Sequence, residues 1–518
     1  MPQIKVHEKA LAHLSRGLYR SPASALRELV SNAWDANAQM IRIDTNYPNF
    51  LQLSVQDNGD GFTKSDFESL MDGGIGNSAK RPTHEPLIFN RPIIGRLGIG
   101  MLGIAQICGS FTITSKPKKG GDGFRAHIRL YDLLKDKLDR KDKEVYVSDD
   151  EDVSPREIDV GEYTFEGFDA EKAKYGTLII SDDIHPTFVR SFRKSLEYET
   201  FKQPPLEWTK ALRILNNVHS LQELGDYWRL LWELSAACPV PYISDLALPK
   251  HLIIEEQERL ASYNFKVVVD GIQLYKPVNL RNNPEGYTIK KIEPTTLKIY
   301  GKDVSFHGYI LVQEGLQIKP DELRGIMIRI KNIGIGYYDY SLLDYRINEG
   351  PRSRWVTGEI FVDEGLEDAL NIDRDSFNRF HPEFRAIQEH VHQILQKDIF
   401  PRVYKQIDVR SKKRAKEKQE KRQEYLKATI AESVKKQVKI KGEGKISKAE
   451  QSQQVEVVQK SNVVELHLPN AEDLKTKKSA QQLASAILAI FEIANEGNTN
   501  EKRREVFKKL LLDLLTKW

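Results

Sequence analysis

The segment Arg27–Ala36 constrains this chain most, because it combines an acid, an amide and a second acid with an apolar surface. In a helix, Glu28, Asn32 and Asp35 stand at positions i, i+4 and i+7, so the three side chains point to one side. The apolar positions between them can seat the helix on another element. A carboxylate and a carboxamide that face one pocket can hold a hydrated divalent cation and a water molecule beside it.

Ser21 and Pro22 mark the start of this helix. Serine is a good N-cap and proline is a good first helical residue, so we predict a helix from here to about Ala38. Residues 1–20 are predicted to form a short separate helix. Two alternating segments after the main helix predict the strands of a hairpin, 40–45 and 51–56.

The predicted hairpin ends at an acid, in the run Asp57-Asn58-Gly59-Asp60-Gly61. The two glycines let the backbone turn tightly and approach a flat ligand closely. An acid at a strand end before such a turn can accept a hydrogen bond from an exocyclic amine. A plain turn and a calcium-binding loop are the alternatives, although Gly59 and Gly61 offer no side-chain oxygen at the third and fifth positions of a calcium loop.

Two glycine-rich runs follow at residues 73–80 and 95–103, and they contain the cations Lys80 and Arg96. Because the second run leads into an apolar helix predicted at 101–108, the pattern suits a mobile lid that ends on a phosphate-binding helix N-terminus. The formal G-x-G-x-x-G match within the second run is weak, since the context of a dinucleotide fold or a kinase is missing.

The rest of the first domain reads as strands joined by loops. A charged insertion at 133–172 is predicted to be loop-like. The domain is therefore predicted as an α+β fold, with helices layered on a mostly antiparallel sheet that closes near residue 190. Its further strands are predicted at 111–116, 124–130 and 176–182.

Four motifs in this region together resemble those of the GHKL ATPase superfamily, which comprises gyrase-type topoisomerases, ninety-kilodalton heat-shock chaperones, histidine kinases, and MutL and MORC proteins. The order and spacing both fit over residues 1–190. The resemblance implies a Bergerat-type two-layer α/β sandwich. The motifs are Glu28-x-x-x-Asn32-x-x-Asp35, Asp57-x-Gly59-x-Gly61, Gly95-x-x-Gly98-x-Gly100 and Gly176-Thr177.

The resemblance also implies that this site binds ATP and Mg²⁺. Glu28 would be the general base that orients the attacking water, and Asn32 would be the magnesium ligand. Asp57 would accept a hydrogen bond from the adenine amino group, and Thr177 would support the adenine end. The other residues that the resemblance places around the nucleotide are Asp35, Gly59, Gly61, Ser78, Lys80, Arg96, Leu97, Gly98, Ile99, Gly100 and Met101.

Three of these positions keep a second interpretation. Asp35 can instead tie its helix to the motif loops as structural support. Lys80 and Arg96 can instead be solvated charges on the lid.

Residues 191–400 are predicted to form a middle domain with a helical insertion at about 191–260. This region resembles the transducer domain of the chaperone, MutL and gyrase branches, which lends a basic residue to the γ-phosphate. The candidates for that catalytic role are Lys331 and Arg374, and Arg374 is favoured because Leu-Asn-Ile-Asp-Arg at 370–374 is similar to a chaperone motif. A surface ion pair is the alternative for Arg374. The strands are predicted at 265–269, 297–300, 304–311, 326–331 and 358–363.

The C-terminal part begins with a basic helical arm at 401–450. Residues 402–450 hold 17 Lys and Arg against 7 Asp and Glu, a local charge of +10 in a chain whose net charge is +4. Either a solvated helix or a contact with DNA phosphates explains such a run. Residues 451–518 are predicted to be a small dimerisation or partner-docking module, or to pack back on their own chain.

The leading hypothesis is an ATP-driven homodimeric clamp that acts on DNA or with a nuclease partner in bacterial defence, nearest to MORC-like and MutL-like proteins. A chaperone-like ATPase that clamps protein clients is the alternative, favoured by the Leu-Asn-Ile-Asp-Arg run. Only two cysteines are present, and the N-terminus has no apolar signal core. We therefore expect a cytoplasmic protein that does not engage membranes.

Overall fold

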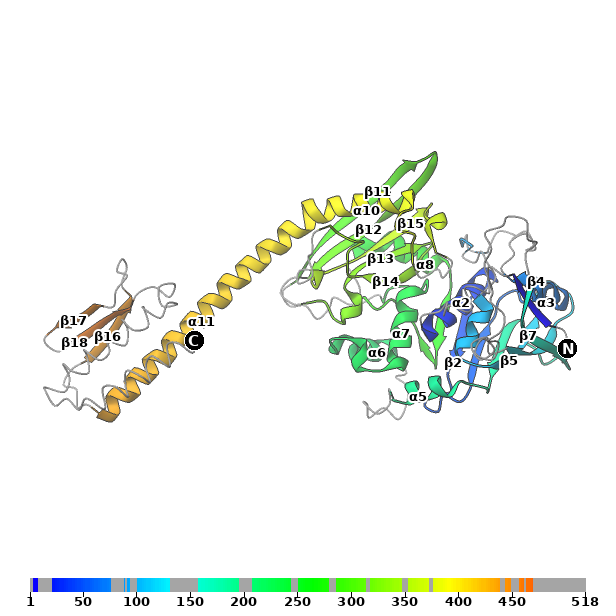
Figure 1. The fold of residues 1–518 in the computed structure, drawn as a ribbon, viewed down its shortest axis with the longest axis horizontal. Coiled ribbons are helices and arrows are strands. Elements are labelled where there is room, and N and C mark those ends of the chain that lie inside the picture. The colour runs from blue at the N-terminus through cyan, green and yellow to red at the C-terminus, as the bar shows by residue number, and fades with distance from the viewer. Residues whose placement is uncertain are drawn as a thin grey trace, which may run out of the picture. The chain divides into compact units, whose positions relative to one another are not determined.

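The computed structural model resolves into two compact units, residues 1–404 and residues 405–518. Figure 1 traces the elements of each unit. The described residues are 3–7, 21–75, 88, 91–93, 100–130, 157–194, 207–243, 250–278, 286–313, 317–346, 353–371, 376–437, 443–448, 456–460 and 463–468.

The first sheet joins ten strands of the described residues in the order β10-β9-β2-β3-β8-β5-β6-β7-β1-β4. Neighbouring strands are antiparallel except for two parallel pairs, β9 with β2 and β1 with β4. Together with its helices the sheet makes the predicted α+β fold. The strands are β1 (Gln3–His7), β2 (Met40–Asp44), β3 (Leu53–Asp57), β4 (Asp72–Ile75), β5 (Ser110–Lys116), β6 (Phe124–Leu130), β7 (Glu157–Glu166), β8 (Gly176–Ser181), β9 (Lys266–Val269) and β10 (Ile272–Gln273).

Three sequence predictions for this sheet are wrong. Residues 3–7 form a strand rather than a helix, because Ile4 and Val6 alternate with polar residues at the period of a strand. Strand β7 lies inside the segment that we predicted to be a loop. Strand β9 pairs in parallel with β2 instead of joining the middle-domain sheet, so the first sheet recruits chain from beyond residue 260.

The predicted helix α2 (Pro22–Asp35) is confirmed, with Ser21 as its N-cap. It packs against β2, against the 3-10 helix η3 (Gly100–Gln106), and against α7 (Asp226–Ala237) (Figure 1). The apolar helix that we predicted at 101–108 is thus a 3-10 helix that ends at Gln106. The other helices of this part are α3 (Lys64–Met71) and α5 (Pro186–Lys194).

The segment after α5 is helical, as predicted. Its tryptophans Trp208, Trp228 and Trp232 are buried and form part of the core. Besides α7, the elements are α6 (Trp208–Asn217), the 3-10 helix η4 (Leu221–Glu223) and α8 (Lys250–Ser262).

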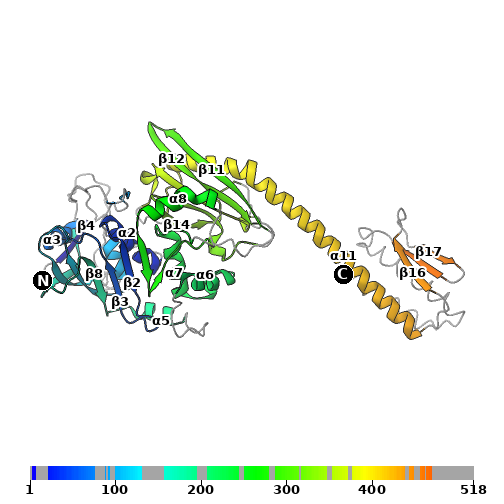
Figure 2. The same ribbon diagram turned by 180° about the vertical axis from the view of Figure 1, so that it is seen from behind.

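A second sheet has the strand order β11-β12-β15-β13-β14. Helix α8 lies on the face that Figure 2 turns toward the viewer, where His307 of β12 reaches Glu256. The neighbouring residue Phe306 contacts the ring of His390 on α10, so α8 and α10 cover opposite faces. The elements are β11 (Tyr287–Ile299), β12 (Lys302–Gln313), η5 (Asp321–Leu323), β13 (Gly325–Ile330), β14 (Ile333–Asp339), β15 (Val356–Glu364), η6 (Glu367–Ala369) and α10 (Pro382–Ile394).

The chain continues through a π-helical turn (Leu395–Ile399) into the long helix α11 (Phe400–Gln437). The second unit also contains a small sheet in which β16 (Glu443–Lys448) and β17 (Glu456–Lys460) flank β18 (Val463–Leu468). Most of the module predicted at 451–518, including everything after residue 468, lies outside the described residues. Among the helices that are described, none combines the length and the apolar character needed to cross a membrane.

Candidate active site

Helix α2 carries the predicted general base. Its N-cap hydroxyl, on Ser21, accepts a hydrogen bond from the backbone N–H of Ser24. Glu28 follows two turns into the helix and is only 8% exposed, with its Oε1 3.7 Å from Nη2 of the buried Arg27. Asn32, one turn further, is exposed, and Asp35 is half-buried. The helix therefore presents a buried carboxylate beside an accessible carboxamide.

Asp57 lies at the end of β3, where the sequence places it. Its Oδ1 accepts hydrogen bonds from the backbone N–H of Gly59 at 2.7 Å and of Thr177 at 3.3 Å. Burial raises the pKa of Asp57, whereas these two N–H groups, the charge of Lys118 and a side-chain hydrogen bond from Thr177 oppose the rise. A carboxylate in this setting is oriented by neutral donors, and no cation among the described residues forms an ion pair with it.

Close backbone approaches around Asp57 require glycine at the motif positions. A Cβ at Gly59 would lie 2.6 Å from the carbonyl oxygen of Ala36, and one at Gly176 would lie 2.3 Å from the carbonyl oxygen of Asp57 itself. Gly61 and Gly176 also have positive φ angles, which strain other residues. The motif glycines thus allow the loop, α2 and β8 to meet at Asp57.

The loop is also tied to the C-terminal end of α2. Asn37 donates to Asp60 Oδ2 at 2.6 Å, and the Asp60 N–H donates to the carbonyl of Ala36 at 2.6 Å. Asn58 Oδ1 in turn accepts from the backbone N–H groups of Gln39 and Met40. The two motifs therefore form one rigid corner.

Sequence reasoning missed a second anchor, which is built on Arg91. The guanidinium donates from Nη1 to the carbonyl of Ala38 at 2.6 Å and from Nε to the carbonyl of Tyr263 at 2.9 Å. It also lies over the rings of Trp34 and Phe265. Trp34 Nε1 donates to the carbonyl of Pro92, so the end of α2 holds residues 91–93 in place. The tryptophan on the apolar side of α2 was the only sequence signal for this contact.

Of the two candidate transducer cations, the structure describes Lys331. It lies in the turn between β13 and β14 with φ of 51°. Its Nζ is 3.2 Å from the carbonyl oxygen of Ile93 and 3.2 Å from Glu367 Oε1. Lys331 is thereby brought to the anchored segment that leads into the second glycine-rich run.

The remaining predicted site residues belong to the lid region and to the second transducer candidate. Gly100 and Met101 are the first two residues of η3. The positions outside the described residues are Ser78, Lys80, Arg96, Leu97, Gly98, Ile99 and Arg374.

The second sheet contains a buried charged cluster that the sequence did not reveal. Glu359 and Arg329 are both fully buried, and Arg329 Nε donates to Glu359 Oε1 at 3.0 Å. The hydroxyls of Tyr242, Tyr309 and Tyr338 also donate to this carboxylate. Burial works to raise the pKa of Glu359, but Arg329, the nearby Lys276 and the hydroxyl donors hold it at about 2. This carboxylate has its full complement of donors.

Residues 19–150 match the family described as histidine kinase-, DNA gyrase B- and HSP90-like ATPases. This segment belongs to the GHKL superfamily. The matched segment, called the GHKL domain below, contains the α2 and Asp57 motifs. ATP binding is the activity that this family match supports.

Two curated relatives are similar to this chain over about 100 residues each. A protein of Herpetosiphon aurantiacus named "Putative type II restriction enzyme HgiDII" is 34% identical over 117 residues, which is 23% of this chain and 18% of that protein. The DNA mismatch repair protein MutL of Lactobacillus delbrueckii subsp. bulgaricus is 32% identical over 94 residues, which is 18% of this chain and 14% of that protein. The chain thus spans less than a fifth of either relative.

Among solved structures, the N-terminal domain of a DNA repair protein is similar, with 13% sequence identity and a TM-score of 0.37. The alignment covers 76% of this chain and 98% of that one.

The residues present in the GHKL domain fit ATP and Mg²⁺. No group of three His, Cys, Asp or Glu side chains among the described residues could hold a metal ion by itself. Mg²⁺ needs no such cage, because it commonly takes one or two protein oxygens together with phosphate oxygens and water. The exposed carboxamide of Asn32, next to the Glu28 carboxylate, supplies an oxygen of this kind.

Proposed function

We propose that this protein is a Mg²⁺-dependent ATPase that uses ATP as a conformational switch. The observation that carries the proposal is the corner at Asp57, where a half-buried carboxylate is oriented by Gly59 and Thr177 and closely approached by glycine backbone. A carboxylate offers about four acceptor positions, so three protein donors leave room for a ligand amine. The adenine amino group has the required chemistry.

Hydrolysis requires a base at the other end of the nucleotide. Glu28 accepts the proton of the attacking water while the bond between the γ-phosphorus and the β,γ-bridging oxygen breaks, giving ADP and phosphate. Asn32 would hold Mg²⁺, which when bound neutralises phosphate charge. Lys331, beside the carbonyl of Ile93, is the described cation that can approach the phosphates from the second sheet. Arg374 remains the other candidate for this contact.

The test is turnover in the variant Glu28→Ala. We expect phosphate release to fall by about 10² to 10⁴-fold, while ATP affinity stays near that of the wild type. Glu68→Ala is the matched control, because Glu68 is an exposed acid on the neighbouring helix α3. Wild-type turnover in Glu28→Ala would refute the role of the base.

We further propose that the switch works as a homodimeric clamp on DNA, alone or with a nuclease partner. The names of the two relatives, a restriction enzyme and a mismatch repair protein, support a DNA role. Helix α11 supports it as well, because its lysines Lys412, Lys413, Lys416 and Lys418 are all exposed. Cations on an exposed helix bind phosphates without reading bases.

This part is tested by gel shift of plasmid DNA with the full chain, with and without a non-hydrolysable ATP analogue. We expect ATP-dependent binding that weakens steeply with salt and is lost when Lys412, Lys416 and Lys418 are changed to Glu. Replacing Lys172, Lys174 and Lys298, three lysines outside α11, by Glu is the control for net charge. Binding that ignores salt and the α11 substitutions would contradict a phosphate contact through this helix.

A further inference from the structure

Helix α7 is wedged between the catalytic helix and the second sheet. It packs against α2 on one side and against β14 on the other. The approach to β14 is close, since a Cβ added to Gly334 would lie 3.2 Å from the Cα of Ala237 and 3.3 Å from the carbonyl oxygen of Ala236. Strand β14 begins directly after the turn that holds Lys331. A displacement of that turn therefore reaches α7 through backbone contacts.

One side chain continues this path from α7 to α2. Glu233, which is 6% exposed, lies one turn before Ala236 and accepts a hydrogen bond from the hydroxyl of Ser21 at 2.8 Å. Arg229, one turn earlier on α7, donates to the other oxygen of Glu233 at 2.6 Å. The Glu233 carboxylate is thus fixed by Arg229 of its own helix α7, and it holds Ser21, the N-cap of α2.

The contact sets the direction of the Ser21 hydroxyl. A hydroxyl has one proton and two acceptor positions. Because the Ser21 proton is given to Glu233, the lone pairs are left for the N–H of Ser24, which is the N-cap bond of α2. Glu28 lies one turn beyond Ser24 on the same helix. Moving Glu233 therefore shifts the end of the helix on which the general base stands.

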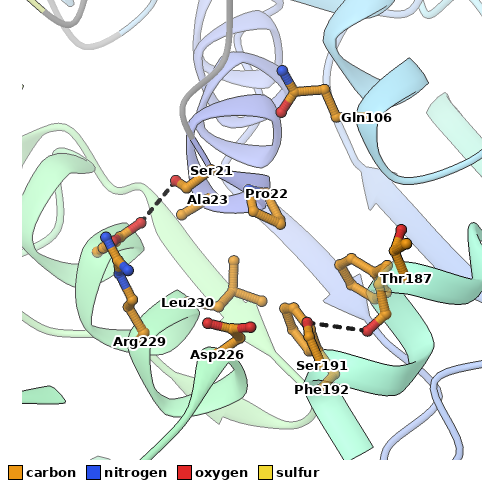
Figure 3. Close-up of a pocket in the computed structure, with 12 residues that line it drawn as sticks. Ser21, Pro22, Ala23, Gln106, Thr187, Ser191, Phe192, Asp226, Arg229 and Leu230 are labelled. Atoms are coloured by element: carbon orange, nitrogen blue, oxygen red, sulfur yellow. Dashed lines mark hydrogen bonds and ion pairs between the residues drawn. The ribbon is translucent and has the colours of Figure 1, made fainter. Parts of the chain in front are cut away.

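A cavity of about 350 Å³ borders this joint. Figure 3 shows Ser21, Arg229, Asp226 and Leu230 around it, with the hydrogen bond of Ser21 marked. The cavity lies beside the hydrogen bond between Ser21 and Glu233, which joins α2 to α7 on this side.

We propose that Glu233 is a positioning residue for ATP hydrolysis, which couples the β13–β14 turn to Glu28 through the N-cap of α2. This inference rests on the proposed ATPase activity. Because a small misplacement of a catalytic group costs rate more than ligand binding, the coupling acts on kcat rather than on ATP affinity.

The decisive variant is Ser21→Gly in the full chain. Glycine is nearly as good an N-cap as serine, so α2 keeps its start while the link to Glu233 is lost. We expect kcat for ATP to fall about tenfold or more, with the Kd for ATP within about twofold of the wild type. Glu233→Ala should give the same loss, and Ser21→Gly/Glu233→Ala should give no further loss, because both changes cut one contact.

Two controls separate positioning from general destabilisation. Glu233→Gln keeps an acceptor for the Ser21 hydroxyl and should restore most of the rate. Thr63→Ala removes the N-cap of α3, a helix without catalytic residues, and should leave kcat unchanged. An active wild type with Ser21→Gly at the wild-type rate, or an equal loss in Thr63→Ala, would overturn the coupling. A wild type without any ATPase activity would instead overturn the proposed function.

Discussion

Two regions of this molecule are each built around one carboxylate, half-buried at Asp57 and fully buried at Glu359, and the pKa values of the two are shifted in opposite directions. Asp57 is held by backbone N–H groups and a hydroxyl, and its pKa is raised by burial. Glu359 is held by a buried guanidinium and three tyrosine hydroxyls, and its pKa is lowered to about 2. Both are oriented by their surroundings, but among the described residues Glu359 forms a direct ion pair with a cation and Asp57 forms none.

The difference separates a ligand site from a structural one. Partial burial of a charge is costly, as the raised pKa of Asp57 shows, so this carboxylate gains when a ligand supplies further donors. Glu359 gains nothing from a ligand, because four protein residues, Tyr242, Tyr309, Arg329 and Tyr338, already donate hydrogen bonds to it. The acceptor positions that the protein leaves open on the well-oriented Asp57 carboxylate are therefore the physical basis for proposing that this corner binds the nucleotide.

The largest expected effect is the loss of folding stability on substitution of Glu359. Changing Glu359→Gln leaves Arg329 buried without its counter-charge, which should lower the free energy of unfolding by about 3 to 5 kcal/mol. Urea unfolding measures the loss, with the exposed Glu364→Gln on the same strand as control. ATP affinity of the folded fraction should stay unchanged. A loss below about 1 kcal/mol would show that the second cluster is not a closed structural unit.

Asp57→Asn should act in the opposite manner, on binding and not on folding. The amide directs N–H groups at the adenine amine, so we expect the Kd for ATP to rise about 100-fold, which corresponds to a lost hydrogen bond to a charged group. The melting temperature should fall little or rise, because the cost of burying the charge is removed. Equilibrium titration of ATP and thermal unfolding together check this. Unchanged ATP affinity would place the base of the nucleotide elsewhere.

A smaller effect comes from His307, in a second charged group of the same sheet. Burial works to lower the pKa of His307, but hydrogen bonds to Asp363 and Glu256 raise it to about 9. The pKa of a histidine in the unfolded chain is about 6.5. The folded state thus binds the proton more tightly, so this stabilisation is complete below about pH 6.5 and is lost as the pH rises through about 9.

Chemical denaturation between pH 6 and pH 9.5 tests the linkage. We expect the wild type to lose on the order of 2 kcal/mol across this range relative to His307→Gln. The ring also stacks on Phe361, and Arg259 pairs with the same acids, so Arg259→Gln controls for loss of charge at this position. Parallel curves for the wild type and His307→Gln would contradict the raised pKa.

Whether a part of the site could be predicted from the sequence depended on how far apart its contacting residues lie in the chain. The Asp57 corner was predictable because Gly59, Gly61 and the helix with Glu28 lie close by in the chain, and their residue types follow from a tight turn. The Glu359 cluster was not, because its donors come from positions 242, 309, 329 and 338 and bring no local pattern. The only sequence signal was a glutamate inside the apolar run of β15. Such a buried acid needs a partner, but the hydrophobic pattern does not identify which residue that partner is.

Strand assignments failed for a related reason. Strand β9 has the composition of any buried strand, and only its parallel pairing with β2 assigns it to the first sheet. The clamp of Arg91 on Ala38 and Tyr263 likewise joins segments about 50 and 170 residues away in the chain. The local motifs therefore predicted which residues meet at the Asp57 corner, whereas the attachment of this corner to the second sheet required the structure.

The account depends most directly on what Asp57 binds, and the wild-type protein can test this without any substitution. Inosine triphosphate differs from ATP mainly in carrying a carbonyl oxygen where adenine carries its amino group. Because a site built to accept a hydrogen bond rejects a ligand that lacks the donor, we predict a Kd at least about 100-fold weaker for inosine triphosphate than for ATP, measured by equilibrium titration with Mg²⁺. Equal affinities for the two nucleotides would contradict the assignment of Asp57 and the nucleotide corner built on it.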